Sequence, residues 1–96
     1  MRSISVCPCV YVLLLEGDEN FAEYYYCGST YCLNQRLSMH IAGLGAHWTR
    51  LHQFKSIVEV RLVEEGSALA VENELTLQYM SNHNPAQVRG GRYCRV

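Results

Sequence analysis

The sequence predicts a mixed α/β (α+β) fold, in which a small, three-stranded, mostly antiparallel sheet is flanked by helices in the order β-β-α-β-α. Three observations predict it: two β-favouring runs separated by a turn cluster, two segments with helical periodicity, and one alternating run between those segments. The chain has 96 residues, 49% of them apolar, which suits one packed core. We therefore expect a single domain over residues 1–96.

The first two strands are predicted to form a hairpin. Residues 9–15 are a continuous β-favouring run, typical of a central strand, and residues 17–20 form a turn cluster. Residues 21–27 then return with three tyrosines, and alternation with a period of two places Tyr24 and Tyr26 on one face. Buried tyrosine hydroxyls need hydrogen-bond partners, although core packing is the usual task of such residues.

Helical periodicity predicts the next element over residues 33–42, and the glycines that follow are expected to end this helix. Its apolar stripe consists of Leu33, Leu37, Ile41 and Leu44. Residues 46–55 are expected to form a loop or a short helical turn.

A third strand is predicted over residues 56–64, where the side chains alternate between two sets. A glycine ends this strand, and Ser67 is the expected N-cap of a second helix over residues 68–80. The polar segment 82–96 is expected to be mostly loop, with a short helix after Pro85.

The net charge of −1 argues against a generic nucleic-acid coating protein, which would usually be strongly basic. Seven of the eight basic residues are arginines, whose planar guanidinium binds phosphate through two hydrogen bonds at once. Arg89, Arg92 and Arg95 lie within seven residues of one another. A local phosphate-facing surface and a solvated tail with scattered arginines both agree with this pattern.

The five cysteines are odd in number, so a secreted framework in which every cysteine is paired is not predicted. No two are separated by two residues, so the pattern of a zinc ribbon or finger is missing. Free thiols in a reducing compartment are the simplest interpretation. Two alternatives stay open: a mixed site of Cys27, Cys32 and a histidine, and a thiol-based metal or redox protein that uses Cys7, Cys9, Cys27 and Cys32.

The N-terminal segment is not predicted to be a signal peptide. Pro8 interrupts its apolar residues, the run ends at Leu15 before Glu16, and no cleavage site of small residues follows. The run is also too short to span a membrane. We therefore expect an intracellular protein, in the cytoplasm or nucleus, without a membrane partner.

Glu72 is unusual for its position in the second predicted helix. It shares the face that this helix should bury with Ala68, Val71, Leu75 and Tyr79. A buried carboxylate costs several kcal/mol unless it is paired or binds a metal. A metal site and a salt bridge to Arg36 or Arg61 are therefore the two interpretations of Glu72.

Arg36 and His40 lie four residues apart, on one face of the first predicted helix and at the border of its apolar stripe. An arginine beside a histidine at the edge of a core can hold a phosphate and transfer a proton. A surface pair without a task is the alternative.

Together these residues form an ordered set. It consists of Cys9-Val10-Tyr11, then Tyr26-Cys27-Gly28 followed by Ser29-Thr30, then Arg36, His40, Glu72 and Asn84. In this order and spacing the set resembles the GIY-YIG nuclease family over about residues 9–84. Two departures are that Cys9 replaces the first glycine of the family pattern, and that a longer gap separates the two tyrosines, which a hairpin insertion explains.

The resemblance implies a metal-dependent DNA endonuclease that hydrolyses phosphodiester bonds with one divalent metal, and thus a task in DNA repair or recombination. It implies that Glu72 binds Mg²⁺ (or Mn²⁺) and that Arg36 neutralises charge on the phosphate. Tyr11, helped by His40, is the favoured base, with Tyr26 as its rival. The phenol would need its pKa lowered by the metal, Arg36 or His40.

Further residues are expected to support this site. Gly28, Thr30 and Asn84 match the family pattern, and His47 is either a second functional histidine or an ordinary loop residue. The segment 43–50 is similar to members that recognise branched or otherwise structured DNA. The candidates for contacts with the DNA backbone are Arg50, Lys55, Arg89 and Arg92.

A non-cleaving module that binds DNA or a partner through the same fold is the alternative function. The sequence does not indicate which DNA structure or sequence is bound. Specificity is therefore expected to come from loops, from self-association or from a partner protein.

Overall fold

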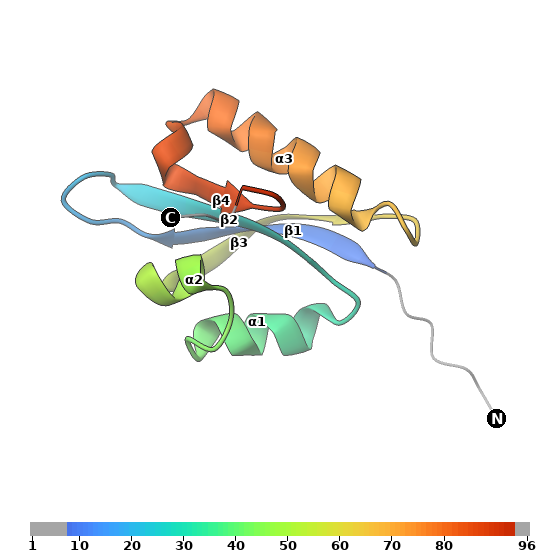
Figure 1. The fold of residues 1–96 in the computed structure, drawn as a ribbon. Coiled ribbons are helices and arrows are strands. Elements are labelled where there is room, and N and C mark those ends of the chain that lie inside the picture. Colours follow the sequence, from blue (N-terminus) through green and yellow to red (C-terminus); the bar gives the residue numbers. More distant parts are fainter. Residues whose placement is uncertain (1–7, 94–96) are drawn as a thin grey trace.

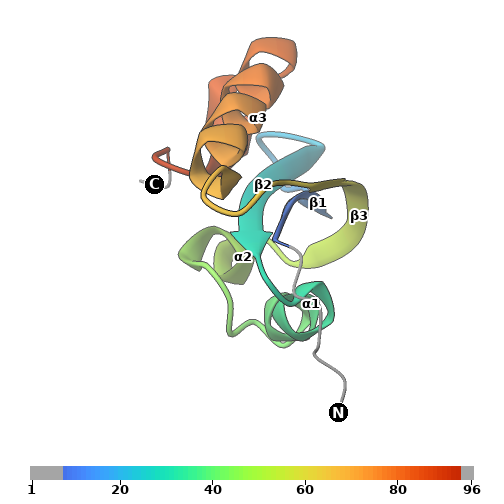
Figure 2. The same cartoon turned by 90° about the vertical axis from the view of Figure 1, so that its right-hand side faces the viewer.

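The computed structural model describes residues 8–93 as one four-stranded sheet with helices on both faces (Figures 1 and 2). In chain order the elements are β1 (Cys9–Glu16), β2 (Glu23–Thr30), α1 (Leu33–Ile41), α2 (His47–Leu51), β3 (Phe54–Leu62), α3 (Ala68–Asn82), a 3-10 helix η1 (Pro85–Gln87) and β4 (Val88–Gly90). The mixed α/β class and the order β-β-α-β-α are confirmed. The short helix expected after Pro85 corresponds to η1, and β4 is an addition.

The strand order in the sheet is β3-β1-β2-β4. β1 pairs antiparallel with both β2 and β3, and the β1–β2 hairpin places Tyr11 opposite Gly28. β4 pairs in parallel with β2, with Tyr25 opposite Val88. The predicted number of three strands was therefore wrong by one. β4 has only three residues, too few for any periodicity to be read from the sequence.

The central strand β1 is buried on both faces, as its unbroken apolar run predicted. Val10 and Val12 face α3 and pack with Leu75 in one core cluster. Tyr11 and Leu13 belong to a second cluster on the opposite face, which α1 and α2 cover (Figure 1). Since successive side chains of a strand point to opposite faces, β1 contributes to both cores.

The tyrosines of β2 divide between the two faces in the predicted way. Tyr24 is buried in the cluster that contains Tyr11, and Tyr26 packs against the same cluster. Tyr25 belongs to the α3 side. The strand continues two residues past Gly28 to Thr30, whereas the sequence analysis ended it at Cys27.

Only half of the residues in the predicted apolar stripe of the first helix are packed against the core. Leu33 and Leu37 pack against the core, but Ile41 and Leu44 are 59% and 70% exposed. The prediction fails there because the helix ends at Ile41, and Gly43 with a φ of +76° turns the chain away from the sheet.

The remaining elements differ from the prediction mainly at their ends. The short helical turn expected within residues 46–55 is α2, β3 begins two residues before the predicted start, and α3 runs on to Asn82. Ser67 does stand at the N-cap of α3, but its side chain makes no capping hydrogen bond. Within residues 8–93, none of the helices has the length and apolar character needed to cross a bilayer.

Candidate active site

Tyr11 and Tyr26 come together where β1 and β2 pair. Their ring centroids lie 6.4 Å apart, and Gly28 sits directly opposite Tyr11. A Cβ atom at Gly28 would lie 2.5 Å from the Tyr11 hydroxyl oxygen and 2.9 Å from the Tyr26 ring. Glycine is therefore required at this position so that both tyrosine rings can pack over the strand.

His40, at the C-terminal end of α1, completes an aromatic cluster with the two tyrosines. Its Nε2 atom lies 2.8 Å from the Tyr11 hydroxyl oxygen, at hydrogen-bonding distance. The imidazole is buried and also packs against the Tyr26 ring. The alternative that Arg36 and His40 form a surface pair is therefore wrong for His40.

The other nitrogen of His40 has a partner that the sequence analysis did not identify. Nδ1 lies 3.0 Å from the hydroxyl oxygen of Thr49 on α2, and this hydroxyl donates to the carbonyl of Ala46 at 2.9 Å. Thr49 is buried. The only signal for it was its place in the segment 43–50, which had been singled out without an individual role for Thr49.

The pKa values of Tyr11 and His40 depend on burial and on neighbouring charged or titratable groups. Burial raises the pKa of Tyr11 well above its usual value; Tyr26 and Glu72 raise it further, while the Arg36 guanidinium opposes them. Burial, together with Arg36, lowers the pKa of His40. The site therefore favours a neutral phenol next to a neutral imidazole, and Arg36 by itself does not lower the pKa of Tyr11 below normal.

Glu72 lies on the buried face of α3, as predicted, and is 9% exposed. Its carboxylate makes no hydrogen bond or ion pair with any residue between positions 8 and 93. The alternative of a salt bridge fails for Arg61, which pairs with Glu59 at 3.1 Å, and also for Arg36.

Glu72 offers a carboxylate that could bind a metal ion. The described residues contain no cluster of three or more His, Cys, Asp or Glu side chains that could enclose an ion. Mg²⁺ does not need such a cluster, because it keeps several water ligands and binds through one or two carboxylates. The Glu72 carboxylate is little exposed and has no partner in the described part of the chain, which fits a largely hydrated divalent cation of this kind.

Arg36 borders a hollow of about 230 Å³ at the start of α1. The hollow is lined by Thr30, Cys32, Gln35, Arg36 and Met39. The Thr30 hydroxyl accepts a hydrogen bond from the Cys32 amide at 3.0 Å and so shapes the turn into α1. An anion in this hollow would meet the guanidinium of Arg36.

Asn84 lies apart from Glu72 and from the cluster of Tyr11, Tyr26 and His40. Its side chain accepts a hydrogen bond from the Ala86 amide and caps η1, beyond the C-terminal end of α3. Glu72 lies ten residues before that end, which corresponds to roughly 15 Å along the helix axis. Asn84 therefore shapes the connection to β4 and is not part of the cluster.

The predicted DNA-contacting residues are spread over several elements. Arg50 is exposed on α2, Lys55 is exposed on β3, and Arg92 is exposed after β4. His47, which was expected to be either a second functional histidine or an ordinary loop residue, is exposed on α2.

Arg89 is engaged within the fold. Its guanidinium lies 4.8 Å from the centre of the Trp48 ring and donates to the carbonyls of Pro85 and Val88. These contacts connect β4 with α2, so Arg89 has a structural task. Arg95 falls outside the described residues.

The cysteines do not form the alternative metal or redox site among the described residues. Burial raises the pKa of the Cys9 thiol and raises that of Cys27 to about 12, which disfavours the thiolate that such chemistry needs. Cys32 is free and exposed, whereas Cys27 is free and buried. Cys7 and Cys94 lie outside the described residues.

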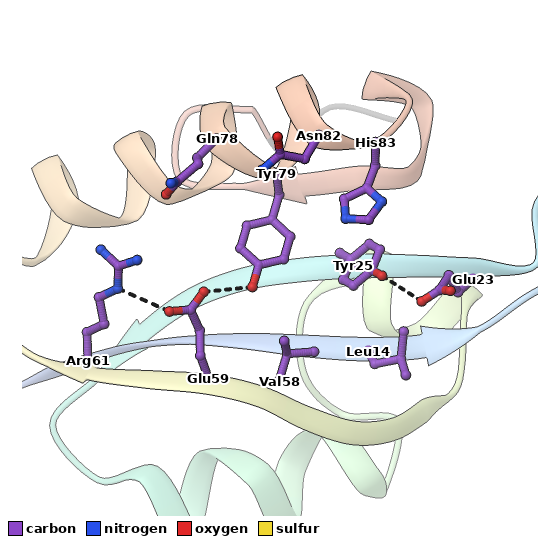
Figure 3. A pocket seen from close by; sticks show the side chains of 10 residues that line it. All are labelled: Leu14, Glu23, Tyr25, Val58, Glu59, Arg61, Gln78, Tyr79, Asn82 and His83. Carbon is purple, nitrogen blue, oxygen red and sulfur yellow. Dashed lines mark hydrogen bonds and ion pairs between the residues drawn. The ribbon is translucent and has the colours of Figure 1, made fainter.

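A larger hollow, about 500 Å³, lies on the opposite face of the sheet, between α3 and the strands (Figure 3). Here Tyr79 donates to Glu59 and Tyr25 donates to Glu23, each at 2.6 Å. None of the residues selected from the sequence as site candidates lines it. Size alone would therefore select a different region of the molecule from the one that the sequence indicates.

Comparison with known protein families finds a match over most of the chain. The model of the GIY-YIG catalytic domain matches residues 7–86 of the chain. No curated protein and no solved structure matches it.

Proposed function

The chain belongs to the GIY-YIG catalytic-domain family, and on that premise we propose that it is a metal-dependent endonuclease that hydrolyses phosphodiester bonds in DNA. Members of the family are nucleases that act on DNA and generally depend on a divalent metal. The observation that carries the proposal is the 2.8 Å contact between the Tyr11 hydroxyl and His40, on which Arg36 and Glu72 both act.

Tyr11 is the proposed base, with His40 as the acceptor of its proton. When a water molecule attacks phosphorus, its proton passes to the Tyr11 oxygen while the phenol proton passes to Nε2 of His40. The phenol is never required to ionise in the resting enzyme, which agrees with its raised pKa. His40 then returns the proton to solvent. This pairing favours Tyr11 over Tyr26 as the base.

Arg36 is proposed to bind the scissile phosphate in the hollow at the start of α1. Its guanidinium can donate two parallel hydrogen bonds to non-bridging phosphate oxygens. Charge on these oxygens increases in the transition state, so a fixed guanidinium stabilises the transition state more than the substrate.

Glu72 is proposed to hold the divalent cation, Mg²⁺ or Mn²⁺. When bound, such a cation polarises the phosphate and stabilises the leaving oxygen. The part played by the chain is to present one carboxylate near the tyrosine pair, little exposed and without a partner among residues 8–93. A DNA substrate also implies that the protein works where DNA is, in the cytoplasm or nucleus.

The test is a cleavage assay with end-labelled DNA as linear duplex, nicked duplex, flap and four-way junction, each with Mg²⁺, Mn²⁺ or EDTA. Glu72→Ala is compared with Glu74→Ala, which removes an exposed carboxylate from the same helix. We expect cleavage that needs the metal, survives in Glu74→Ala and is lost in Glu72→Ala. Circular dichroism confirms that both variants fold.

Two outcomes would overturn the proposal or part of it. Equal cleavage by Glu72→Ala and the wild-type protein would remove Glu72 from the site. Binding to every DNA without cleavage by the wild-type protein would favour the non-cleaving module.

Preference for flaps or junctions would support a task in repair or recombination. One site cuts one strand, so double-strand breaks would require self-association, a partner protein or two visits.

A further inference from the structure

A chain of hydrogen bonds runs behind Tyr11 and ends on α2. Tyr11 contacts Nε2 of His40 at 2.8 Å, Nδ1 of His40 contacts the Thr49 hydroxyl at 3.0 Å, and this hydroxyl contacts the Ala46 carbonyl at 2.9 Å. His40 and Thr49 are each only 2% exposed. Water therefore does not take the place of either partner.

The number of protons determines the direction of each bond. The Ala46 carbonyl can only accept, and two oxygens 2.9 Å apart repel unless a proton lies between them, so the Thr49 hydroxyl donates to Ala46. Its single proton is then used, and its oxygen accepts from Nδ1 of His40. Because a neutral imidazole carries one N–H, Nε2 is left as an acceptor for the Tyr11 hydroxyl.

We propose that Thr49 is a positioning residue that holds His40 in the Nδ1–H tautomer and thereby makes Nε2 the proton acceptor of Tyr11. The catalytic consequence rests on the proposed endonuclease function. The tautomer itself is a property of the resting protein and can be measured without any DNA.

Two features of the fold keep the Thr49 side chain in contact with His40. Trp48, next to Thr49, donates its indole N–H to the Tyr25 carbonyl at 3.0 Å and so fastens α2 to the sheet. Gly45 lies against the imidazole, and any Cβ atom there would overlap Nδ1 and Cε1 of His40. The ring thus has little freedom to rotate away from Thr49.

The experiment compares the wild-type protein with three variants by NMR of the ¹⁵N-labelled histidine rings, at a pH where His40 is neutral. Thr49→Val keeps the side-chain shape but loses the acceptor oxygen, and Thr49→Ser keeps it. Thr76→Val is the matched control, because Thr76 is another buried threonine whose hydroxyl donates to a backbone carbonyl, that of Glu72 at 2.7 Å.

We expect a protonated Nδ1 and a bare Nε2 on His40 in the wild-type protein, Thr49→Ser and Thr76→Val. In Thr49→Val the Nε2–H form should appear, and kcat for cleavage should fall about 10- to 100-fold with KM unchanged. Thr49→Ser should retain most of the wild-type kcat.

A proton on Nε2 in the wild-type protein, or an unchanged tautomer in Thr49→Val, would overturn this inference. If Thr49→Val does not fold, the wild-type and Thr49→Ser spectra still decide, because both must carry the proton on Nδ1. A protein that shows the expected tautomers but cuts no DNA would refute the proposed function and leave the inference about Thr49 standing. A protein that cuts DNA but keeps its tautomer in Thr49→Val would refute the inference about Thr49 and leave the proposed function standing.

Discussion

Tyrosine hydroxyls on the two faces of the sheet have different acceptors. On the α3 face, Tyr79 and Tyr25 donate to the carboxylates of Glu59 and Glu23 (Figure 3). On the α1 face, Tyr11 contacts the imidazole of His40 instead. Burial is the first cause of the raised pKa of all three phenols, so burial alone does not distinguish them.

The tyrosine hydroxyls on the two faces differ in the group that accepts their hydrogen bond. A carboxylate is a weak base near neutral pH and, being negative, it also disfavours the phenolate; it therefore holds the phenol proton in place. A neutral imidazole has a pKa closer to neutrality and can take that proton during a reaction. The same side chain is thus a structural donor on one face and a candidate for proton transfer on the other.

The largest difference is expected between the arginines of the two faces. Arg36→Ala should lower kcat/KM for DNA cleavage on the order of a thousandfold, because the transition state loses its guanidinium donor. Arg61→Ala should leave cleavage unchanged, since Arg61 pairs with Glu59 on the α3 face. Steady-state cleavage of the preferred DNA measures both, and similar losses in the two variants would contradict the assignment.

A smaller but still large loss is expected when the phenol on the α1 face is removed. Tyr11→Phe should lower kcat about a hundredfold, because the ring remains but the proton path from water to His40 is cut. Tyr79→Phe is the control on the other face. Single-turnover cleavage separates the chemical step from DNA binding; a wild-type rate in Tyr11→Phe would transfer the role of base to Tyr26.

The pH dependence of DNA cleavage should follow the protonation state of His40. Its pKa is lowered from 6.5 by burial and by Arg36, and Nε2 accepts a proton only when the ring is neutral. Cleavage should therefore rise as the pH rises through a value below 6.5, with about a tenfold loss per pH unit on the acid side. NMR titration of the His40 ring in the free protein supplies the value for comparison. A midpoint that does not follow the measured pKa of His40 would contradict the neutral-imidazole mechanism.

The smallest effect is expected on stability, from the α3 face. Tyr79→Phe should lower the free energy of unfolding at neutral pH by about 1 kcal/mol, the usual value of one hydrogen bond. The Tyr79 hydroxyl is the main cause of the lowered pKa of Glu59. A carboxyl whose pKa is lowered by folding stabilises the protein above its unfolded pKa, and this stabilisation is lost as the pH falls through the folded value.

The deficit of Tyr79→Phe should accordingly shrink in acid. Urea unfolding of the variant and the wild-type protein at neutral pH, and again below the folded-state pKa of Glu59, measures this change. A deficit that stays constant across the pH range would show that the bond to Glu59 does not contribute through the charge of its carboxylate.

Much of the fold could be predicted because it depends on local periodicity. The unbroken run of β1, the division of Tyr24 and Tyr25 between two faces and the burial of Glu72 on α3 were all read from side-chain spacing, and the structure has them. β4 could not be read in this way, because a strand of three residues exists only through its parallel pairing with β2.

Some features of the candidate site could likewise be predicted from local patterns in the sequence, and others could not. The ordered set of tyrosine, arginine, histidine and glutamate by itself determined the family of this chain, since these residue types and spacings are written in the sequence. Only the tertiary structure decided the partners of those residues: Tyr11 with His40, 29 positions apart, and His40 with Thr49. It also decided that Asn84 caps η1 far from the cluster. Hydrogen bonds of this kind depend on how a helix docks on a sheet, and docking is set by the packing of both cores, which no local pattern encodes.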